Sequence, residues 1–197
     1  MSIDSSSAPG DGCVLLAASA GGVEGLGVLL GGLQAGLAAP VLVAQHLRRG
    51  RETRIVAVLS SSTALDIKLA EDGEVARAGV VYIAPPDRHL CVRPDRKLAL
   101  TEEAPVNFAR PAADPLFESA AKAYGAGCVA CVLTGTDGDG TRGVKAVKAR
   151  NGTVIVQDPE TADFHSMPRS AIRTGLVDLV LPLPEIAPAI ARTVRHG

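Results

Sequence analysis

The sequence predicts an α/β fold: a doubly wound, mostly parallel sheet with helices on both faces and a small β-hairpin excursion. Short apolar runs rich in β-branched residues alternate with longer segments of helical period along most of the 197 residues. Repeated strand–helix units of this kind form an open parallel sheet. Hydrophobic residues make up 47% of the chain but aromatic residues only 3%. A core of aliphatic side chains is typical of buried parallel strands covered by helices.

The first half of the chain begins this alternation. Residues 13–18 (CVLLAA) form an apolar run that predicts a strand, and it leads directly into Ser-Ala-Gly-Gly. A helical pattern follows over residues 23–33, and residues 40–44 (PVLVA) predict the second strand. A second helix is expected around residues 51–60, where a run of serines and a threonine marks its end.

The middle of the chain departs from the strand–helix pattern. Residues 80–84 (VVYIA) predict a strand that two prolines stop. Residues 89–92 and 97–101 alternate around Pro-Asp-Arg, which indicates a hairpin. Residues 102–113 predict an irregular loop, and loops of this length are uncommon unless they are functional.

The second half returns to strand–helix units. Residues 114–124 predict a helix, with Asp114 as its N-cap and Pro115 in its first turn. The remaining predicted elements are strands at 128–133, 153–157 and 177–181 and helices at 140–149, 168–175 and 184–195.

Length, charge and composition restrict the class of protein. We expect one domain over residues 13–197, preceded by a disordered polar tail at residues 1–12 that does not resemble a signal peptide. The formal net charge is −1, which argues against a nucleic-acid-binding surface or a polybasic membrane anchor. No apolar run reaches the roughly 18 residues of a membrane span, so no membrane insertion is expected.

Four cysteines are present, and two of them form a C-x-x-C at Cys128 and Cys131. This spacing occurs in redox and zinc sites, but here it lies inside an apolar run with no second Cys or His pair at ligand spacing. We interpret both as small buried strand residues, and expect neither a metal nor a cofactor. A reducing, cytoplasmic compartment fits this cysteine usage.

Three predicted strands end in polar residues, and ligands of open parallel sheets bind beyond the carboxyl ends of the strands. Ser19 follows the first strand, and Ala20, Gly21 and Gly22 make a small-residue turn into a helix. This resembles a strand–turn–helix nucleophile elbow without matching G-x-S-x-G, and a turn that holds a phosphate or nucleotide is an alternative.

His46 follows the second strand. The other histidines are worse candidates for a base: His89 lies in the predicted hairpin, His165 in a loop and His196 at the chain's end.

The strand at 128–133 leads into Asp137 and Asp139, in a Gly- and Asp-rich stretch. Calcium is disfavoured, because the twelfth position of an EF-hand loop counted from Asp137 is Lys148. Both carboxylates remain candidates from spacing alone.

A serine, a histidine and a carboxylate at one sheet edge predict a catalytic triad. A serine hydroxyl is a poor nucleophile until an imidazole accepts its proton, and a carboxylate orients that imidazole and stabilises its charged form. The order Ser, His, Asp differs from the Ser, acid, His order of α/β-hydrolases. We therefore expect another arrangement with the same geometry.

These residues resemble the catalytic domain of the chemotaxis-receptor protein-glutamate methylesterase family, in order and without large gaps over about residues 13–190. The matching motifs are 14–22 (VLLAASAGG), 43–46 (VAQH), 71–73 (EDG), 81–89 (VYIAPPDRH), 110–117 (R-P-x-x-D-x-L-F), 132–140 (VLTGTDGDG) and 167–169 (MPR).

The resemblance implies a function and roles for single residues. Family members hydrolyse γ-glutamyl methyl esters on the cytoplasmic helices of chemoreceptors and also deamidate certain receptor glutamines. The motifs place the nucleophile on Ser19, the base on His46 and the acid on Asp139. They place the backbone oxyanion donors around Ala20, Gly21 and Thr136.

The sequence also departs from the family pattern. A P-P-G-F segment often follows the histidine of relatives, whereas Leu47-Arg48-Arg49-Gly50-Arg51 follows His46. The N-R-H-R-P loop appears as Asn107-Phe108-Ala109-Arg110-Pro111, which loses two polar residues and keeps Arg110 as a candidate substrate contact. Arg48, Arg49, Arg51 and Arg54 fit either a grip on an acidic receptor helix or a solvated helix face.

The resemblance raises two further alternatives. Many relatives carry a receiver domain that blocks the cleft, and residues 1–12 cannot hold one, so either this control is lacking or a separate receiver protein supplies it. The rival to a hydrolase is a diverged, non-catalytic signalling module that docks a receptor or regulator, and the altered cleft loop is its best support.

Overall fold

The computed structural model describes residues 12–47 and 53–196. The predicted tail lies outside these residues apart from Gly12, and so do Arg48, Arg49 and Arg51.

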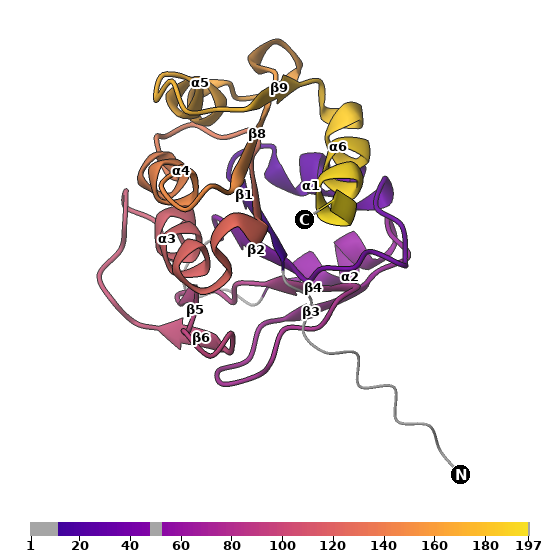
Figure 1. The fold of residues 1–197 in the computed structure, drawn as a ribbon, viewed down its shortest axis with the longest axis vertical. Helices are drawn as coiled ribbons and strands as arrows, with labels where there is room; N and C mark the ends of the chain where they lie inside the picture. The colour runs from indigo at the N-terminus through magenta and orange to yellow at the C-terminus, as the bar shows by residue number, and fades with distance from the viewer. Residues whose placement is uncertain (1–11, 48–52, 197) are drawn as a thin grey trace.

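Seven parallel strands form one sheet, in the order β3-β4-β2-β1-β7-β8-β9, which confirms the predicted fold class (Figure 1). β1 is the central strand, and β2 and β7 are its neighbours. The chain forms β2, the edge strand β3 and then β4 between them on one side of β1 before it crosses to β7, which puts the change of direction beside β1. The strands are β1 (Cys13–Ala18), β2 (Val41–Gln45), β3 (Asp66–Leu69), β4 (Val80–Ile83), β7 (Cys128–Val132), β8 (Thr153–Gln157) and β9 (Leu179–Leu181).

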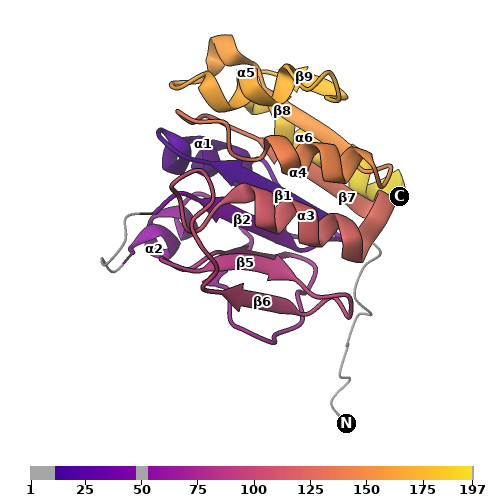
Figure 2. The same cartoon turned by 90° about the vertical axis from the view of Figure 1, so that its left-hand side faces the viewer.

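Helices cover both faces of the sheet (Figures 1 and 2). One face packs against α1 (Gly22–Gly31), α2 (Ile55–Ser60) and α6 (Leu183–His196). The other packs against α3 (Ala113–Tyr124), α4 (Thr141–Lys148), α5 (Ser166–Ile172) and the antiparallel hairpin of β5 (His89–Val92) and β6 (Leu98–Thr101). Two short 3-10 turns, η1 (Gly125–Gly127) and η2 (Pro159–Thr161), complete the described elements.

The two cores show why the central strands are apolar throughout. Along β1, Leu15 and Ala17 lie in the core under α3, whereas Val14, Leu16 and Ala18 lie in the core under α1. Side chains alternate between the faces of a strand, so a strand covered on both faces buries every side chain. The C-x-x-C residues follow the same rule. Cys128 and Cys131 are buried, free thiols in β7, which confirms their interpretation as strand residues.

The differences from the predicted elements are local. The edge strand β3 was not predicted, because Asp66 and Lys68 interrupt its apolar pattern. α5 begins two residues before Pro168, since proline is tolerated in the first turn of a helix. β9 is shorter than predicted and its first two residues are exposed, as befits an edge strand.

The contact between α3 and α4 generates a prediction about stability. A Cβ on Gly143 would lie 2.4 Å from Phe117 Cβ, so Gly143→Ala must push the two helices apart. We expect the free energy of unfolding to fall by about 2 kcal/mol, measured by chemical denaturation. Gly36→Ala is the matched control, because a Cβ there meets nothing within 4 Å. An equal loss in both variants would contradict this packing.

Candidate active site

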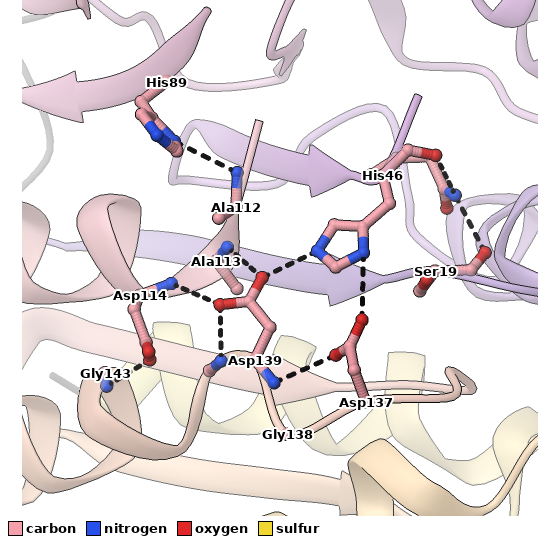
Figure 3. A network of polar contacts seen from close by, with 12 residues as sticks. Ser19, His46, His89, Ala112, Ala113, Asp114, Asp137, Gly138, Asp139 and Gly143 are labelled. Carbon is pink, nitrogen blue, oxygen red and sulfur yellow. Dashed lines mark hydrogen bonds and ion pairs between the residues drawn. The ribbon is translucent and has the colours of Figure 1, made fainter. Parts of the chain in front are cut away.

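The three predicted site positions follow three adjacent strands of the sheet centre. Ser19 comes after β1 and His46 after β2, and the register that pairs Ala18 with Gln45 makes these two residues neighbours. The His46 backbone amide donates to Ala18 O at 3.1 Å. On the opposite side of β1, the Ser19 amide donates to Thr134 O at 3.0 Å, beyond the end of β7. The chain therefore brings Ser19, His46 and the loop after β7 to one rim, as predicted (Figure 3).

Hydrogen bonds fix the backbone around Ser19 from several sides. Its carbonyl oxygen accepts from the Gly22 amide at 2.9 Å and from Gln45 Nε2 at 2.8 Å. The next carbonyl, of Ala20, accepts from Thr134 Oγ1 at 3.0 Å. The Ser19 turn is thus tied to the helix that follows it and to the ends of both neighbouring strands.

Two glycines allow this turn to pack closely. Gly21 has a φ of 71° at the N-cap of α1, a conformation that glycine adopts at little cost. Gly135 lies against Ser19, since a Cβ on it would be 3.0 Å from Ser19 Cβ and 2.1 Å from Met167 Sδ. A side chain at Gly135 would push the β7 loop away from the serine.

His46 lies between two carboxylates (Figure 3). Its Nε2 is 2.7 Å from Asp139 Oδ2, and its Nδ1 is 3.3 Å from Asp137 Oδ2. Burial of the ring lowers its pKa, but the hydrogen bonds to Asp137 and Asp139 and their charges outweigh burial and raise the pKa of His46 to about 9. The described arrangement therefore favours the protonated imidazole.

Asp139 is a buried carboxylate that holds the N-terminus of α3. Its side chain is 0% exposed. Oδ2 accepts from the Ala113 amide at 2.5 Å, and Oδ1 accepts from the amides of Asp114 at 3.1 Å and Gly140 at 2.9 Å. The first amides of a helix lack partners within it and carry partial positive charge, so they stabilise a carboxylate. This network fixes the oxygen that contacts His46.

The predicted N-cap of α3 is wrong. The N-cap position is Ala112, which makes no side-chain cap, and Asp139 caps the helix from a distant part of the chain. The Asp114 carboxylate instead accepts from the Gly143 amide at 2.8 Å and pairs with Arg142 at 3.3 Å. Sequence spacing favours a local cap, whereas the folded chain supplies a better-placed carboxylate.

The hydroxyl of Ser19 makes no hydrogen bond to His46 within the described part of the chain. His46 and Ser19 are strand neighbours, but both ring nitrogens point at acids. The contact between imidazole and carboxylate is present, and the contact between hydroxyl and imidazole requires His46 Nδ1 to leave Asp137.

Backbone amides near Ser19 are available for an oxyanion. Those of Ala20, Gly21 and Thr136 donate to no acceptor among the described residues. Their role stays a prediction, and Thr136 is exposed at the rim.

An open pocket of about 400 Å³ lies beside His46 and Asp137. Its opposite wall is the predicted irregular loop, in which Phe108 is fully exposed. The other lining residues are Leu47, Asn107, Ala109 and Arg110.

The guanidinium of Arg110 uses most of its hydrogen-bond donors within the domain. The guanidinium donates to Asp87 Oδ1 from Nε at 3.0 Å and from Nη2 at 2.8 Å. It also donates to the carbonyl oxygens of Glu102 and Glu103. These contacts fix the loop against the body of the domain, and contact with a substrate stays a prediction.

The other described histidines near the sheet do not join the site. His89 is buried, its Nδ1 accepts from the Ala112 amide at 3.2 Å, and its Nε2 contacts Ala104 O at 3.2 Å. Burial lowers the pKa of His89, so it is a structural, neutral residue. His165 is exposed at the start of α5.

Two buried glutamines were missed by sequence reasoning. Gln45 Nε2 donates to the carbonyls of Ser19 and His46, which joins the two strand ends. Gln157 Oε1 accepts from the Thr134 amide at 3.0 Å, and its Nε2 donates to Thr161 O. A polar residue that ends an otherwise apolar strand, as in VLVAQ and TVIVQ, was the available indication.

Neither a metal cluster nor a membrane span is found in the described ranges. No group of three or more His, Cys, Asp and Glu side chains there is arranged to hold a metal ion. None of the helices there combines the length and the apolar character needed to cross a bilayer.

Comparison with known proteins matches the chain to the CheB methylesterase family model over residues 14–190. The chain is 39% identical over 184 residues to the protein-glutamate methylesterase/protein-glutamine glutaminase of group 3 operon from Rhizobium meliloti, covering 93% of this chain and 52% of the relative. It is 36% identical to a putative protein-glutamate methylesterase/protein-glutamine glutaminase from Leptospira interrogans, covering 91% and 93%.

The fold has a solved counterpart. The crystal structure of the Thermotoga maritima CheB methylesterase catalytic domain superposes with a TM-score of 0.89 at 36% identity, covering 94% of this chain and 99% of that one. The chain spans about half the length of relatives such as the Rhizobium protein.

The buried carboxylate generates a stability prediction. Asp139→Ala leaves the amides of Ala113, Asp114 and Gly140 without their acceptor, and we expect the free energy of unfolding to fall by about 2 kcal/mol. Asp137→Ala is the control, because its carboxylate accepts from one backbone amide only and is 30% exposed. Equal losses in chemical denaturation would show that Asp139 does not cap α3.

The raised pKa of His46 generates a second prediction. A folded pKa of about 9 against an ordinary value of 6.5 stabilises the folded state. This contribution is fully present below about pH 6.5 and is lost as the pH rises through about 9. The stability difference between wild type and His46→Gln should therefore shrink from pH 6 to pH 10. Ser19→Ala, which leaves both carboxylates in place, should keep the wild-type slope. A difference that grows with pH would refute the contacts of His46.

Proposed function

The chain belongs to the CheB methylesterase family, and on that premise we propose that it is a serine hydrolase that removes methyl groups from glutamate γ-methyl esters of chemoreceptors. Ser19 is the nucleophile, His46 the general base and Asp139 the residue that orients His46. The observation that carries the proposal is the 2.7 Å contact between His46 Nε2 and Asp139, beside Ser19 on the rim of three adjacent strands.

The roles of the two ring nitrogens of His46 follow from their contacts. Asp139 fixes the ring through Nε2 and is itself fixed by the amides of α3. Nδ1 is therefore the nitrogen that accepts the Ser19 proton. A carboxylate in this position selects the tautomer and stabilises the imidazolium that forms during the reaction.

The reaction proceeds through a covalent intermediate. As His46 Nδ1 takes the hydroxyl proton, Ser19 Oγ bonds to the ester carbonyl carbon, and amides around Ala20, Gly21 and Thr136 bind the oxyanion. His46 returns the proton to the leaving methanol as the C–O bond breaks. Water, deprotonated by His46, then attacks the acyl carbon, and His46 returns this proton to Ser19 Oγ as the acyl–oxygen bond breaks and glutamate leaves. Loss of one oxyanion donor typically costs about 3 kcal/mol of transition-state stabilisation.

The same geometry accommodates glutamine deamidation. The amide carbon of glutamine offers the same attack position as the ester, and His46 protonates the leaving ammonia. The glutaminase activity in the names of the Rhizobium and Leptospira relatives supports including it.

The substrate is a protein surface, so the cleft must be open. The pocket beside His46 is open to solvent and lined by the loop that carries Phe108 and Ala109. In this proposal the substrate is the methylated cytoplasmic helices of chemoreceptors, and the protein acts in the cytoplasm. Residues 13–197 act as the catalytic domain in this proposal, and a separate receiver protein is the candidate regulator.

A non-catalytic docking module remains the rival, and the fully exposed Phe108 at the cleft favours it. Exposed aromatic side chains serve as anchors in protein interfaces. A docking module retains the cleft but needs no reactive serine.

The proposal predicts that Ser19→Ala abolishes labelling by a fluorophosphonate probe. Release of methanol from methylated receptors should fall by at least about 10³-fold, as for the loss of a nucleophile in other triads. Ser166→Ala is the control, since Ser166 is exposed on α5 and should leave both readouts unchanged. Wild-type methanol release by Ser19→Ala would reject the mechanism. Receptor binding by a wild-type protein that neither labels nor releases methanol would favour the docking module.

A further inference from the structure

Asp137 contacts the one ring nitrogen of His46 that the proposed reaction needs free. Its Oδ2 is 3.3 Å from His46 Nδ1. Its Oδ1 accepts from the Asp139 amide at 3.0 Å, so the loop after β7 holds the carboxylate in place. Figure 3 shows the ring bridging the two acids, with Ser19 to one side.

The chemistry of this contact defines a protonation state. An unprotonated Nδ1 and an ionised carboxylate are both acceptors, and two acceptors cannot hydrogen-bond to one another. A proton on Nδ1 makes the contact with Asp137 an attractive ion pair, which the 3.3 Å separation fits. With Nε2 donating to Asp139, the contact is that of an imidazolium, which cannot accept a proton from Ser19.

We propose that Asp137 is a positioning residue that competes with Ser19 for His46 Nδ1 and holds the base in its protonated form until that contact opens. The inference rests on the proposed function, because it assigns a rival to the proton acceptor of Ser19. Opening releases the Nδ1 proton to solvent through the pocket, and the freed lone pair then accepts from Ser19 Oγ.

The exposure of the two acids fits different tasks. Asp139 is 0% exposed and bound by three amides, so it cannot move without freeing the N-terminus of α3. Asp137 is 30% exposed, lines the pocket and gives up one amide bond by moving. Asp137 is thus the acid that an incoming substrate can displace.

The surrounding charges support the competition. Asp137 and Asp139 are the charged groups that raise the pKa of His46, against burial, which lowers it. Burial raises the pKa of Asp137, but the contacts with His46 and with the Asp139 amide outweigh burial and lower the pKa below its ordinary value. Asp137 therefore stays ionised. Arg110 lines the same pocket but is paired with Asp87, and Ser19 is the neutral neighbour that follows β1.

The test is Asp137→Asn, which removes the charge and keeps an oxygen for the Asp139 amide. Two readouts are taken between about pH 6 and pH 10: the pKa of His46 from NMR titration of its ring, and the rate of fluorophosphonate labelling at Ser19. We expect the pKa to fall by at least about one unit. Labelling at pH 7 should then rise by about tenfold, because one unit changes the fraction of free base tenfold.

A charge-matched control separates contact from general electrostatics. A Cβ on Gly21 would lie 2.8 Å from Asp163 Oδ2, so Asp163 lies beside the turn that follows Ser19. The described side-chain contacts of His46 are with Asp137 and Asp139, not with Asp163. Asp163→Asn should leave the titration of His46 and the pH profile of labelling close to wild type. Asp137→Ala should repeat the Asp137→Asn result if the carboxylate itself is the competitor.

Several results overturn the inference. An unchanged His46 titration in Asp137→Asn shows that Asp137 does not hold Nδ1. A lower pKa with slower labelling at every pH shows that Asp137 assists the base and does not compete with Ser19. Wild-type protein that fails to label at any pH overturns the proposed function itself, and the competition with it, while the NMR titration still reports whether the acid contacts the ring.

Discussion

The burial of the Asp139 carboxylate at the N-terminus of α3 is the constraint on which the rest of the site depends. A fully buried charge is costly unless it is bonded, and here backbone amides and the His46 ring supply its partners. The same bonds satisfy amides that would otherwise lack acceptors at the start of a helix. The start of α3 and the orientation of the imidazole therefore depend on the same carboxylate, and its loss disturbs both.

Much of this arrangement could be predicted from sequence because parallel strands end at a common edge. The strand patterns before Ser19, His46 and Asp139 were enough to place the three residues at one rim of the sheet. The cap of α3 could not be predicted, because Asp139 lies 26 residues from Ala113 in the sequence. Nothing in the sequence distinguishes it as a cap from the nearby Asp114. Gln45 and Gln157 were missed for a related reason. Their side chains hydrogen-bond to the ends of neighbouring strands, and these ends are adjacent only in the folded chain.

The choice between Asp137 and Asp139 shows a limit of spacing as evidence. Two acids separated by one glycine after the same strand are equivalent in sequence. In the structure they take opposite nitrogens of one ring, one acid buried under α3 and the other at the pocket. The two acids that compete for one role in the sequence are thus candidates for two roles in the structure. Asp139 orients the His46 base, and Asp137 holds its Nδ1.

The most direct test of the account is a crystal structure of the protein after reaction with a fluorophosphonate. The account predicts phosphorus bonded to Ser19 Oγ, a phosphoryl oxygen within hydrogen-bonding distance of the amides around Ala20 and Thr136, and His46 Nδ1 turned from Asp137 toward the adduct. An adduct on another residue, or one on Ser19 whose oxygen faces away from these amides while His46 stays between both acids, would contradict it.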